Sequence, residues 1–594
     1  MKPINKTQVV KPLRYKQLTS LSVGALTVLA GFFITTQAVQ ALNIPNIPNI
    51  PIVNDPTRPS EMPLDTPEFR TRQPKESLTL PPAPLAKPLP NEGRLLLKKV
   101  EFTGNTVVND DELQKITLPF LNRPLTVRDL EELRTRITAA YVDAGYINSG
   151  AVIPSQSSAD GLLKIKVVEG NLTEVRLEGM GRLRDDYLRE RLLVGAGSPL
   201  NLKKLQEKYQ LLLRDRLIEQ LNGSLLPGAH PGESILMVNV KRARPYQLYA
   251  NADDYTTPLV GGYTGRIGGW VDNLSGFGEH LDAEFMATGG ALGVNTGVEI
   301  PLNAYDTHAT FRYSNTSSSI IGAETPINLF NIKSTTIAYE GGLSQPIYRS
   351  LGINLTAGLN FAVRKSNSSI LGLPDAFTEG VNGVGVTQDT VVRLWQQYTQ
   401  QGTNNAFVMR STFNKGIDAL GATIQNNSLL PSGEFFSWLG QSQYQHRVMD
   451  NGSHFVLKGA VQVAANPLLP MERFSVGGVY TVRGYRENYY VTDNGFNSSL
   501  EFHYPLFGGE SSAKHSLFLV PFMDYGGAWN NPTLAFPNPS KDYLNSVGLG
   551  FNWHYSHVNT EFYYAHDISG HKPPAGASNI QDDGIHFKVS FLAF

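Results

Sequence analysis

The chain has no cysteine, and only 17% of its 594 residues are charged. Without cysteine it has no disulfide, no thiolate metal site and no cysteine nucleophile. The charges sum to −1, which argues against nucleic-acid binding because such binding needs a basic stripe. The 12 histidines do not by themselves imply a metal site. The length exceeds that of one ordinary domain, so several domains are expected.

Long apolar runs are also scarce. One apolar stretch extends from about residue 18 to residue 34, after a basic start and before Val39-Gln40-Ala41, which suits a small-residue cleavage site. Residues 1–41 are therefore predicted to be a secretory signal peptide. A membrane anchor is the alternative, but Thr19, Ser20 and Thr27 interrupt the stretch. An exported chain that stays in a membrane without such helices would cross it as a β-barrel.

Residues 42–94 are rich in proline. Asn43-Ile44-Pro45-Asn46-Ile47-Pro48-Asn49-Ile50-Pro51 opens this segment, and scattered prolines continue to about Pro90. Proline fixes the backbone and removes a hydrogen-bond donor, so we predict an extended, mostly disordered tether. A recognition motif is the alternative. The segment shows no helical periodicity.

Two small αβ modules follow, predicted at residues 95–170 and 171–244. The first begins with a strand over 96–102, continues with a helix over 121–145 that Thr126 caps, and ends with short strands over 151–156 and 162–169. Each module has the pattern strand, helix, helix, strand, strand, which indicates an internal repeat. A small sheet of this kind leaves an edge that accepts an extended guest chain by β-augmentation.

The second module repeats the plan with different sequence. It has a strand over 175–177, a short helix over 185–193, a longer helix marked by Leu202, Leu205, Tyr209 and Leu212, and a closing strand over 234–240.

From residue 245 to 594 the sequence alternates strictly between apolar and polar residues. Apolar positions of the stretches 353–363, 455–463, 547–555 and 585–591 point one way, and polar ones point the other. A soluble sandwich is the alternative, but the signal peptide, the low charge and aromatic strand ends favour a membrane barrel. The length indicates on the order of sixteen antiparallel strands. Phe594 breaks the apolar register of the last strand.

Two short motifs in the last third of the chain single out a charged pair. Val482-Arg483-Gly484-Tyr485 is followed some forty residues on by Phe522-Met523-Asp524-Tyr525-Gly526. An arginine and a carboxylate can form a bidentate pair that holds a loop inward. Both faces of the strand around Asp524 are apolar, so only the cost of a charge in lipid points Asp524 to the lumen.

Residues 95 to 594 resemble the outer-membrane transporters of two-partner secretion, the haemolysin-secretion type, within the superfamily of barrels with polypeptide-transport-associated (POTRA) domains. The stretches 151–156 and 161–170 are similar to the first POTRA domain, and 226–228 with 232–240 to the second. The arginine and aspartate motifs are the most specific part of the resemblance.

The resemblance implies an outer-membrane transmembrane β-barrel of sixteen strands, preceded by two periplasmic POTRA domains. It also implies a loop near 473–490 that folds into the lumen, where Arg483 pairs with Asp524 on the barrel wall. Val482, Gly484 and Tyr485 would complete the loop motif, and Phe522 and Gly526 the wall motif. A helix that plugs the barrel occurs in many members, but the tether here lacks helical periodicity.

The function expected from this resemblance is export of a large unfolded partner protein across the outer membrane. No Gly-x-x-x-x-Gly-Lys motif occurs, so no nucleotide is expected. Outer-membrane lipid, the barrel-assembly machinery and periplasmic chaperones are the other expected partners, with no cofactor, metal or nucleic acid. The Arg483–Asp524 pair gates transport or only braces the barrel, and both roles remain open.

Three other functions are alternatives to export. An enzyme has no supporting motif, since Asp110-Asp111 and Asp582-Asp583 are adjacent pairs expected in loops or helix caps, and His554, His557 and His566 lie in a strand-rich tail. A passive porin would lack the two αβ modules. An insertase for other barrels is the closest alternative, but such proteins typically have more POTRA domains.

Overall fold

The computed structural model describes residues 64, 69, 78–79, 95–156, 160–321, 330–376, 378–379, 381, 385–508, 515–570 and 579–593. The predicted signal peptide, most of the predicted tether and Phe594 lie outside the described residues. No helix within these ranges combines the length and the apolar character that a membrane crossing requires.

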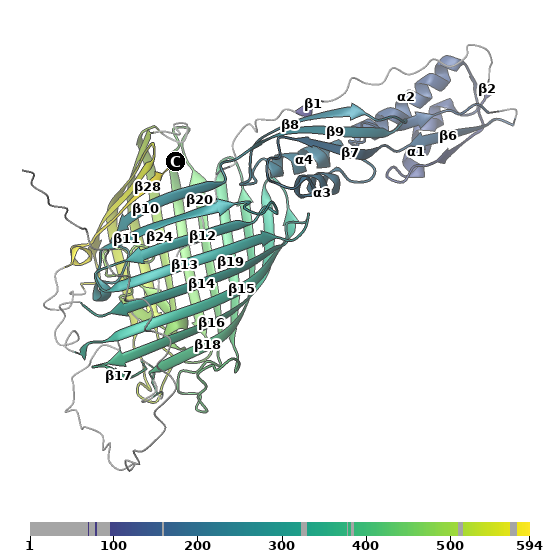
Figure 1. The fold of residues 1–594 in the computed structure, drawn as a ribbon. Helices are drawn as coiled ribbons and strands as arrows, with labels where there is room; N and C mark the ends of the chain where they lie inside the picture. Colours follow the sequence, from purple (N-terminus) through teal and green to yellow (C-terminus); the bar gives the residue numbers. More distant parts are fainter. Residues whose placement is uncertain are drawn as a thin grey trace, which may run out of the picture. The chain divides into compact units, whose positions relative to one another are not determined.

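The first αβ module is built around α2 (Val127–Asp143), which begins at a capping box. Thr126 accepts a hydrogen bond from the backbone of Asp129, and the Asp129 carboxylate accepts one from the backbone of Thr126 at 2.7 Å. On its apolar face Leu133, Ile137 and Tyr141 are buried in the module's core, and Leu130 is partly buried. Its neighbours are β2 (Leu95–Leu96), β3 (Lys99–Thr103), α1 (Asp110–Thr117), β4 (Pro124–Leu125), β5 (Gly150–Val152) and β6 (Leu162–Val168) (Figure 1).

The first strand and the predicted helix of this module differ from the sequence prediction. The helix expected over 121–145 begins only at Val127, because Pro124–Leu125 form the strand β4. β3 begins at Lys99 rather than at Leu96, because Leu95–Leu96 pairs separately with β4. The adjacent acidic residues Asp110 and Asp111 start α1, where negative charge favours the helix N-terminus. The sheet order is β3-β6-β5, with β3 parallel to β6.

The second module has its own apolar core and repeats the same element order. Its elements are β7 (Asn171–Glu178), α3 (Asp185–Ala196), α4 (Leu202–Leu212), β8 (Ile218–Pro227) and β9 (Glu233–Arg242). The sheet order is β1-β8-β9-β7, so the short strand β1 (Leu78–Thr79) from the tether region pairs in parallel with the edge strand β8.

Sixteen long antiparallel strands then close into a barrel, which confirms the predicted fold class. The first and last strands pair with each other, for example through Ala250 and Phe591. A two-residue strand, β17 (Leu373–Pro374), extends only the end of β16. The long strands are β10 (Tyr246–Asp253), β11 (Thr264–Asp272), β12 (His280–Ala287), β13 (Ala291–Pro301), β14 (His308–Ser319), β15 (Lys333–Arg349), β16 (Ile353–Ile370), β18 (Val386–Gln401), β19 (Asn405–Gly416), β20 (Phe436–Arg447), β21 (His454–Ala464), β24 (Asn494–Phe507), β25 (His515–Trp529), β26 (Lys541–Tyr555), β27 (Val558–Asp567) and β28 (Ile585–Ala593).

The alternation along β25 separates the outer and inner faces of the barrel. Met523 is 54% exposed and Tyr525 43% exposed on the outer face, whereas Asp524 is 3% exposed on the inner face. Inner-face residues of β20, such as Gln443 and Gln445, are polar and buried. An apolar outer face and a polar inner face are what a barrel in lipid requires.

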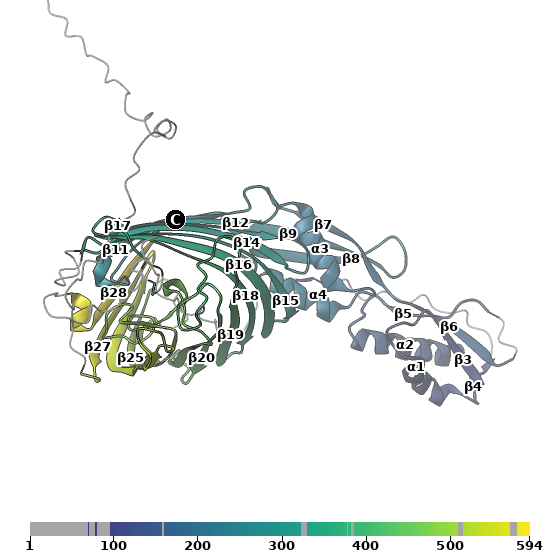
Figure 2. The same cartoon turned by 90° about the horizontal axis from the view of Figure 1, so that it is seen from below.

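Turns between consecutive strands alternate between the two ends of the barrel. The turns 302–307, 350–352 and 448–453 lie at one end, which we call the short-turn end, because an even number of strands precedes each of them. The long connections 417–435 and 465–493 lie at the other end. In Figure 2, which looks into the barrel, green segments of the chain occupy the space inside the ring of strands.

Candidate functional site

The connection between β21 and β24 carries a small hairpin with its own buried cluster. The hairpin consists of β22 (Phe474–Val476) and β23 (Tyr490–Thr492). Phe474, Val476 and Val482 are at most 1% exposed and contact Ala528 and Leu544 of the barrel wall. The connection therefore packs against the inner face of β25 and β26.

Arg483, at the tip of this loop, meets Asp524 in a bidentate pair. Its Nε donates to one carboxylate oxygen and its Nη2 to the other, each at 2.8 Å, and its backbone N–H adds a third bond of 3.0 Å. The two side chains are 3% and 0% exposed. The structure thus brings together the two residues that the motifs singled out, in the geometry that favours arginine over lysine.

Three neighbours of Arg483 and Asp524 in the two motifs, Phe522, Gly484 and Gly526, each meet a requirement of the loop's packing or backbone. The Phe522 ring lies under the Arg483 guanidinium, with 3.5 Å from Cζ to the ring centroid. Gly484 has φ +88°, a conformation that L side chains rarely adopt. A Cβ on Gly526 would come within 2.6 Å of the Val476 side chain.

Tyr485 anchors the far side of the loop. Its hydroxyl donates to the carbonyl of Asn545 at 2.9 Å and also contacts the Asp567 carboxylate. The next residue, Arg486, forms an ion pair with Asp582 at 2.5 Å. Asp582 was expected to be a loop or cap charge, and it does cap a short helix, η5 (Ile580–Asp583), but it also binds this loop arginine.

The sequence did not reveal a second carboxylate at the arginine. Glu501 lies 2.9 Å from Arg483 Nη1 and is 3% exposed, and Lys458 and His503 approach it to 3.0 and 2.9 Å. Ser499 accepts a further hydrogen bond from Arg483 at 2.8 Å. Asn497, Ser499 and Glu501 alternate along β24 and therefore lie on one face of that strand. Nothing in the sequence shows that this face meets the loop.

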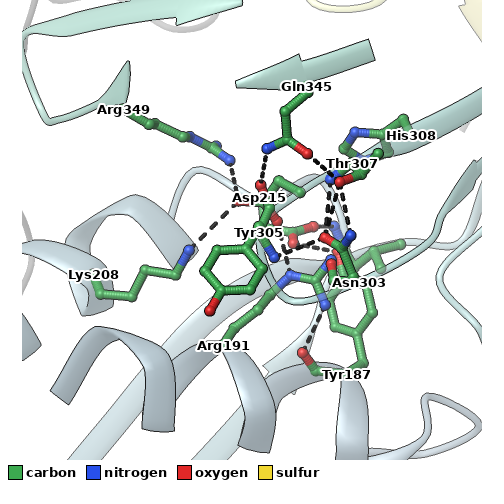
Figure 3. A network of polar contacts seen from close by, with 12 residues as sticks. Tyr187, Arg191, Lys208, Asp215, Asn303, Tyr305, Thr307, His308, Gln345 and Arg349 are labelled. Atoms are coloured by element: carbon green, nitrogen blue, oxygen red, sulfur yellow. Dashed lines mark hydrogen bonds and ion pairs between the residues drawn. The ribbon is translucent and has the colours of Figure 1, made fainter. Parts of the chain in front are cut away.

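A separate polar network joins the second module to the short turns of the barrel (Figure 3). Asp306 lies in the turn between β13 and β14. Its carboxylate forms ion pairs with Arg191 of α3 at 2.8 Å, with Lys208 of α4 at 3.5 Å and with Arg349 of β15 at 2.6 Å. Arg191 also donates to the carbonyls of Tyr187 and Asn303. The carboxylate of this turn residue therefore connects two helices of the module with β15 of the barrel.

The charges of this network shift the ionisation of its members. Burial opposes ionisation of Asp306, but the positive charges of Lys208, Arg349 and Arg191 outweigh it and hold the pKa of that carboxyl below its ordinary value. Burial lowers the pKa of Lys208, and Asp306 opposes the shift. The carboxylate therefore stays charged in the folded protein at neutral pH.

Among the described residues, no group of three or more histidine, aspartate or glutamate side chains is arranged to hold a metal ion. His554 contacts Asn559, and His566 pairs across strands with Val547.

Comparison with known proteins places the chain among outer-membrane barrels with POTRA domains. Residues 232–553 match the family described as haemolysin secretion/activation protein ShlB/FhaC/HecB, and residues 95–170 match the ShlB-type POTRA domain. These matches define the class as a POTRA–barrel secretion protein of the outer membrane. The chain belongs to the ShlB/FhaC/HecB family, and its N-terminal modules lie in the periplasm.

Individual relatives are distant in sequence. The chain is 21% identical to outer membrane transporter CdiB of Dickeya dadantii over 66% of this chain and 69% of that protein. It is 23% identical to heme/hemopexin transporter protein HuxB of Haemophilus influenzae over 76% and 79%. The solved structure of CdiB from Escherichia coli shares the fold, with a TM-score of 0.65, 19% identity and coverage of 87% of this chain and 94% of that one.

Proposed function

We propose that this protein exports a large unfolded partner protein through its barrel, without nucleotide and without enzymatic chemistry. Membership in a family of outer-membrane secretion proteins supports export. The observation that carries the proposal is a polar lumen in which Arg483 holds a loop against the barrel wall. Two periplasmic modules whose sheets offer strand edges precede this barrel. The cargo would be of the adhesin, haemolysin, haem-binding or contact-dependent toxin type.

The strand edges of the periplasmic modules would receive the partner first. In the described part of the chain, β5 pairs only with β6, and β3 only with β6. An extended polypeptide adds to such an edge through its backbone, which does not require a particular sequence. The pairing of β1 with β8 supports the idea, because it places an extended segment of this chain on an edge of the second module.

The loop at Arg483 would control the path through the barrel. Its hairpin lies against the inner faces of β25 and β26, so a chain that passes through the lumen must go beside it or displace it. Three buried carboxylate contacts and a stacked aromatic ring hold the loop tip. Folding of the partner outside the cell would prevent its return and supply direction. The barrel-assembly machinery and periplasmic chaperones would act while this protein is itself assembled.

Secretion by cells tests the proposal. Exchange of Arg483→Ala should leave the barrel in the outer membrane and sharply lower the amount of partner in the medium. Resistance of the barrel to unfolding by detergent at room temperature is the control for correct assembly. Normal secretion from the exchanged protein would remove the loop arginine from the mechanism.

A further inference from the structure

Phe69, which precedes the first module, has its ring at the short-turn end of the barrel lumen. The Arg447 guanidinium carbon lies 4.6 Å from the ring centroid, and the His454 ring meets it edge-on at 5.7 Å. Arg447 ends β20 and His454 begins β21, and the two residues face each other across the strands. Their inward position follows from the alternation, since His454 shares a face with Lys458.

Leu64 contacts the inner wall of the barrel at a second place. It is 9% exposed and lines a small cavity together with Tyr480 and Thr481 of the loop, Ser442 of β20 and Lys458 of β21. Two residues of the segment before the first module therefore touch the inner wall, one beside the Arg483 loop and one at the short-turn end.

A continuous set of contacts joins the Phe69 position to the loop arginine. The His454 ring stacks on that of His503 with 4.7 Å between centroids and an angle of 17°. His503 Nε2 lies 2.9 Å from Glu501, which lies 2.9 Å from Arg483. Whatever occupies the place of Phe69 is therefore four contacts away from Arg483.

We propose that Arg447 and His454 form an aromatic-binding subsite, which Phe69 occupies at rest and an aromatic side chain of the exported polypeptide takes during transport. The inference rests on the proposed export function. A guanidinium over a ring face and an imidazole perpendicular to that ring favour an aromatic ring over an aliphatic side chain of equal size. Arg447 is held for this contact by a 3.0 Å hydrogen bond to the Thr403 carbonyl.

The strength of such a contact suits a chain that must keep moving. One cation–π contact changes occupancy by about 2- to 30-fold, which is enough to select an aromatic residue and too little to trap it. An unfolded polypeptide presents its aromatic residues one after another, whereas a folded protein buries most of them. Phe69 competes as part of the same chain, so it refills the subsite when no exported chain is present.

Displacement of position 69 from the full-length protein in detergent tests the subsite. Phe69 is replaced by the photoreactive aromatic residue p-benzoylphenylalanine, and its cross-link to the stretch 447–454 is measured by mass spectrometry. An unstructured glycine- and serine-rich peptide with one phenylalanine should lower the cross-link at least threefold. The same peptide with leucine in that place should lower it much less. Equal effects of the two peptides, or none from either, would overturn the proposal.

Two exchanges make the test independent of the added peptide. Arg447→Gln should lower the cross-link about threefold, in the range of one cation–π contact. Arg410→Gln is the matched control, because Arg410 covers Trp395 at 4.9 Å elsewhere in the barrel, and the cross-link should not change. An unchanged cross-link in Arg447→Gln would also overturn the proposal.

The outcome separates the subsite from the proposed function. The displacement is measured on purified protein and does not depend on secretion. If the phenylalanine peptide displaces residue 69 selectively, but deletion of the gene leaves the proteins of the culture medium unchanged, the subsite is supported and export is refuted. Secretion by the wild type together with displacement that ignores the ring would support export and refute the subsite.

Discussion

Glu501 lies 2.9 Å from Arg483, so the loop arginine is shared between two buried carboxylates rather than held by Asp524 alone. Lys458 and His503 supply positive or hydrogen-bonding groups on the other side of Glu501. The loop tip is therefore part of a network that spans β21, β24 and β25. Removing one member leaves another member buried without its counter-charge.

Arg483→Ala is the exchange with the largest expected effect on secretion. Asp524 and Glu501 would remain buried beside each other, and the loop tip would lose about 3 kcal/mol or more of local stability. We expect the barrel to reach the outer membrane and secretion to fall at least tenfold. Secreted partner in the medium and barrel abundance in outer-membrane fractions are the two measurements.

The double exchange Arg483→Ala with Asp524→Asn separates bracing from gating. It removes one of the two carboxylates that Arg483→Ala leaves uncompensated, so the barrel should regain part of the stability lost in the single exchange. Secretion should stay low if the loop arginine itself acts in transport. Recovery of secretion together with stability would show that the pair only braces the barrel.

Gly526→Ala should disturb the loop more than an ordinary glycine exchange in a strand. The new Cβ would lie 2.6 Å from Val476 and 2.8 Å from Val482, so the hairpin would have to shift. We expect a cost of about 1–3 kcal/mol from overpacking and lower secretion. Gly265→Ala in β11 is the control, since its Cβ would have no neighbour within 4 Å. Equal behaviour of the two variants in secretion and thermal unfolding would contradict the close approach.

Asp306→Asn should loosen the second module from the barrel. Asparagine leaves Arg191, Lys208 and Arg349 near one another without a negative charge, at a cost of about 3 kcal/mol for a buried site. Backbone amides of α3 and α4 should exchange hydrogen for deuterium faster.

The control for this exchange is Asp186→Asn in the same helix. The Asp186 side chain is 66% exposed and pairs only weakly with Arg189. The hydrogen–deuterium exchange of the Asp186→Asn variant should match that of the wild type. Unchanged protection of α3 and α4 in Asp306→Asn would show that the network does not hold the module.

Glu169 gives the first POTRA domain a defined response to pH. Burial opposes its ionisation, but hydrogen bonds from Thr106, Val107 and Tyr141 outweigh it and lower the pKa of the carboxyl. The stabilisation is therefore present above the ordinary glutamate pKa of about 4.3 and is lost as pH falls through the lower pKa of the folded state.

Glu169→Gln should remove this pH dependence. At neutral pH the variant should show faster hydrogen exchange in β3 and β6 than the wild type, and the difference should shrink as pH falls below about 4. The comparison is made after correction for the intrinsic pH dependence of exchange. A difference that stays constant with pH would rule out the carboxylate as its source.

The sequence predicted the architecture well because burial patterns are local. The alternation along 547–555 and 585–591 requires one apolar and one polar face, and the barrel has both. Thr126 was identified as the N-cap of α2 from its residue type alone, and the structure adds the partner Asp129, which completes a capping box. In contrast, the repeat pattern called for β8 and α1, but their residues were not located. β8 contains the turn-forming residues Asn222 and Gly223, and α1 has few apolar residues.

The site could be predicted only in part. Arg483 and Asp524 stood out through their motifs, and the structure places them in contact. Glu501 and the Asp306 network could not be found, because both depend on which strands and turns meet in three dimensions. Phe69 lies in a proline-rich segment expected to be a tether, and nothing in that segment indicates that Arg447 and His454 receive its ring.

Deletion of the gene followed by inspection of the culture medium tests the central claim most directly. We predict that one large protein disappears from the medium and remains or is degraded in the periplasm. The wild-type gene should restore it, and the Arg483→Ala gene should not. An unchanged set of proteins in the medium of the deletion strain would contradict the account.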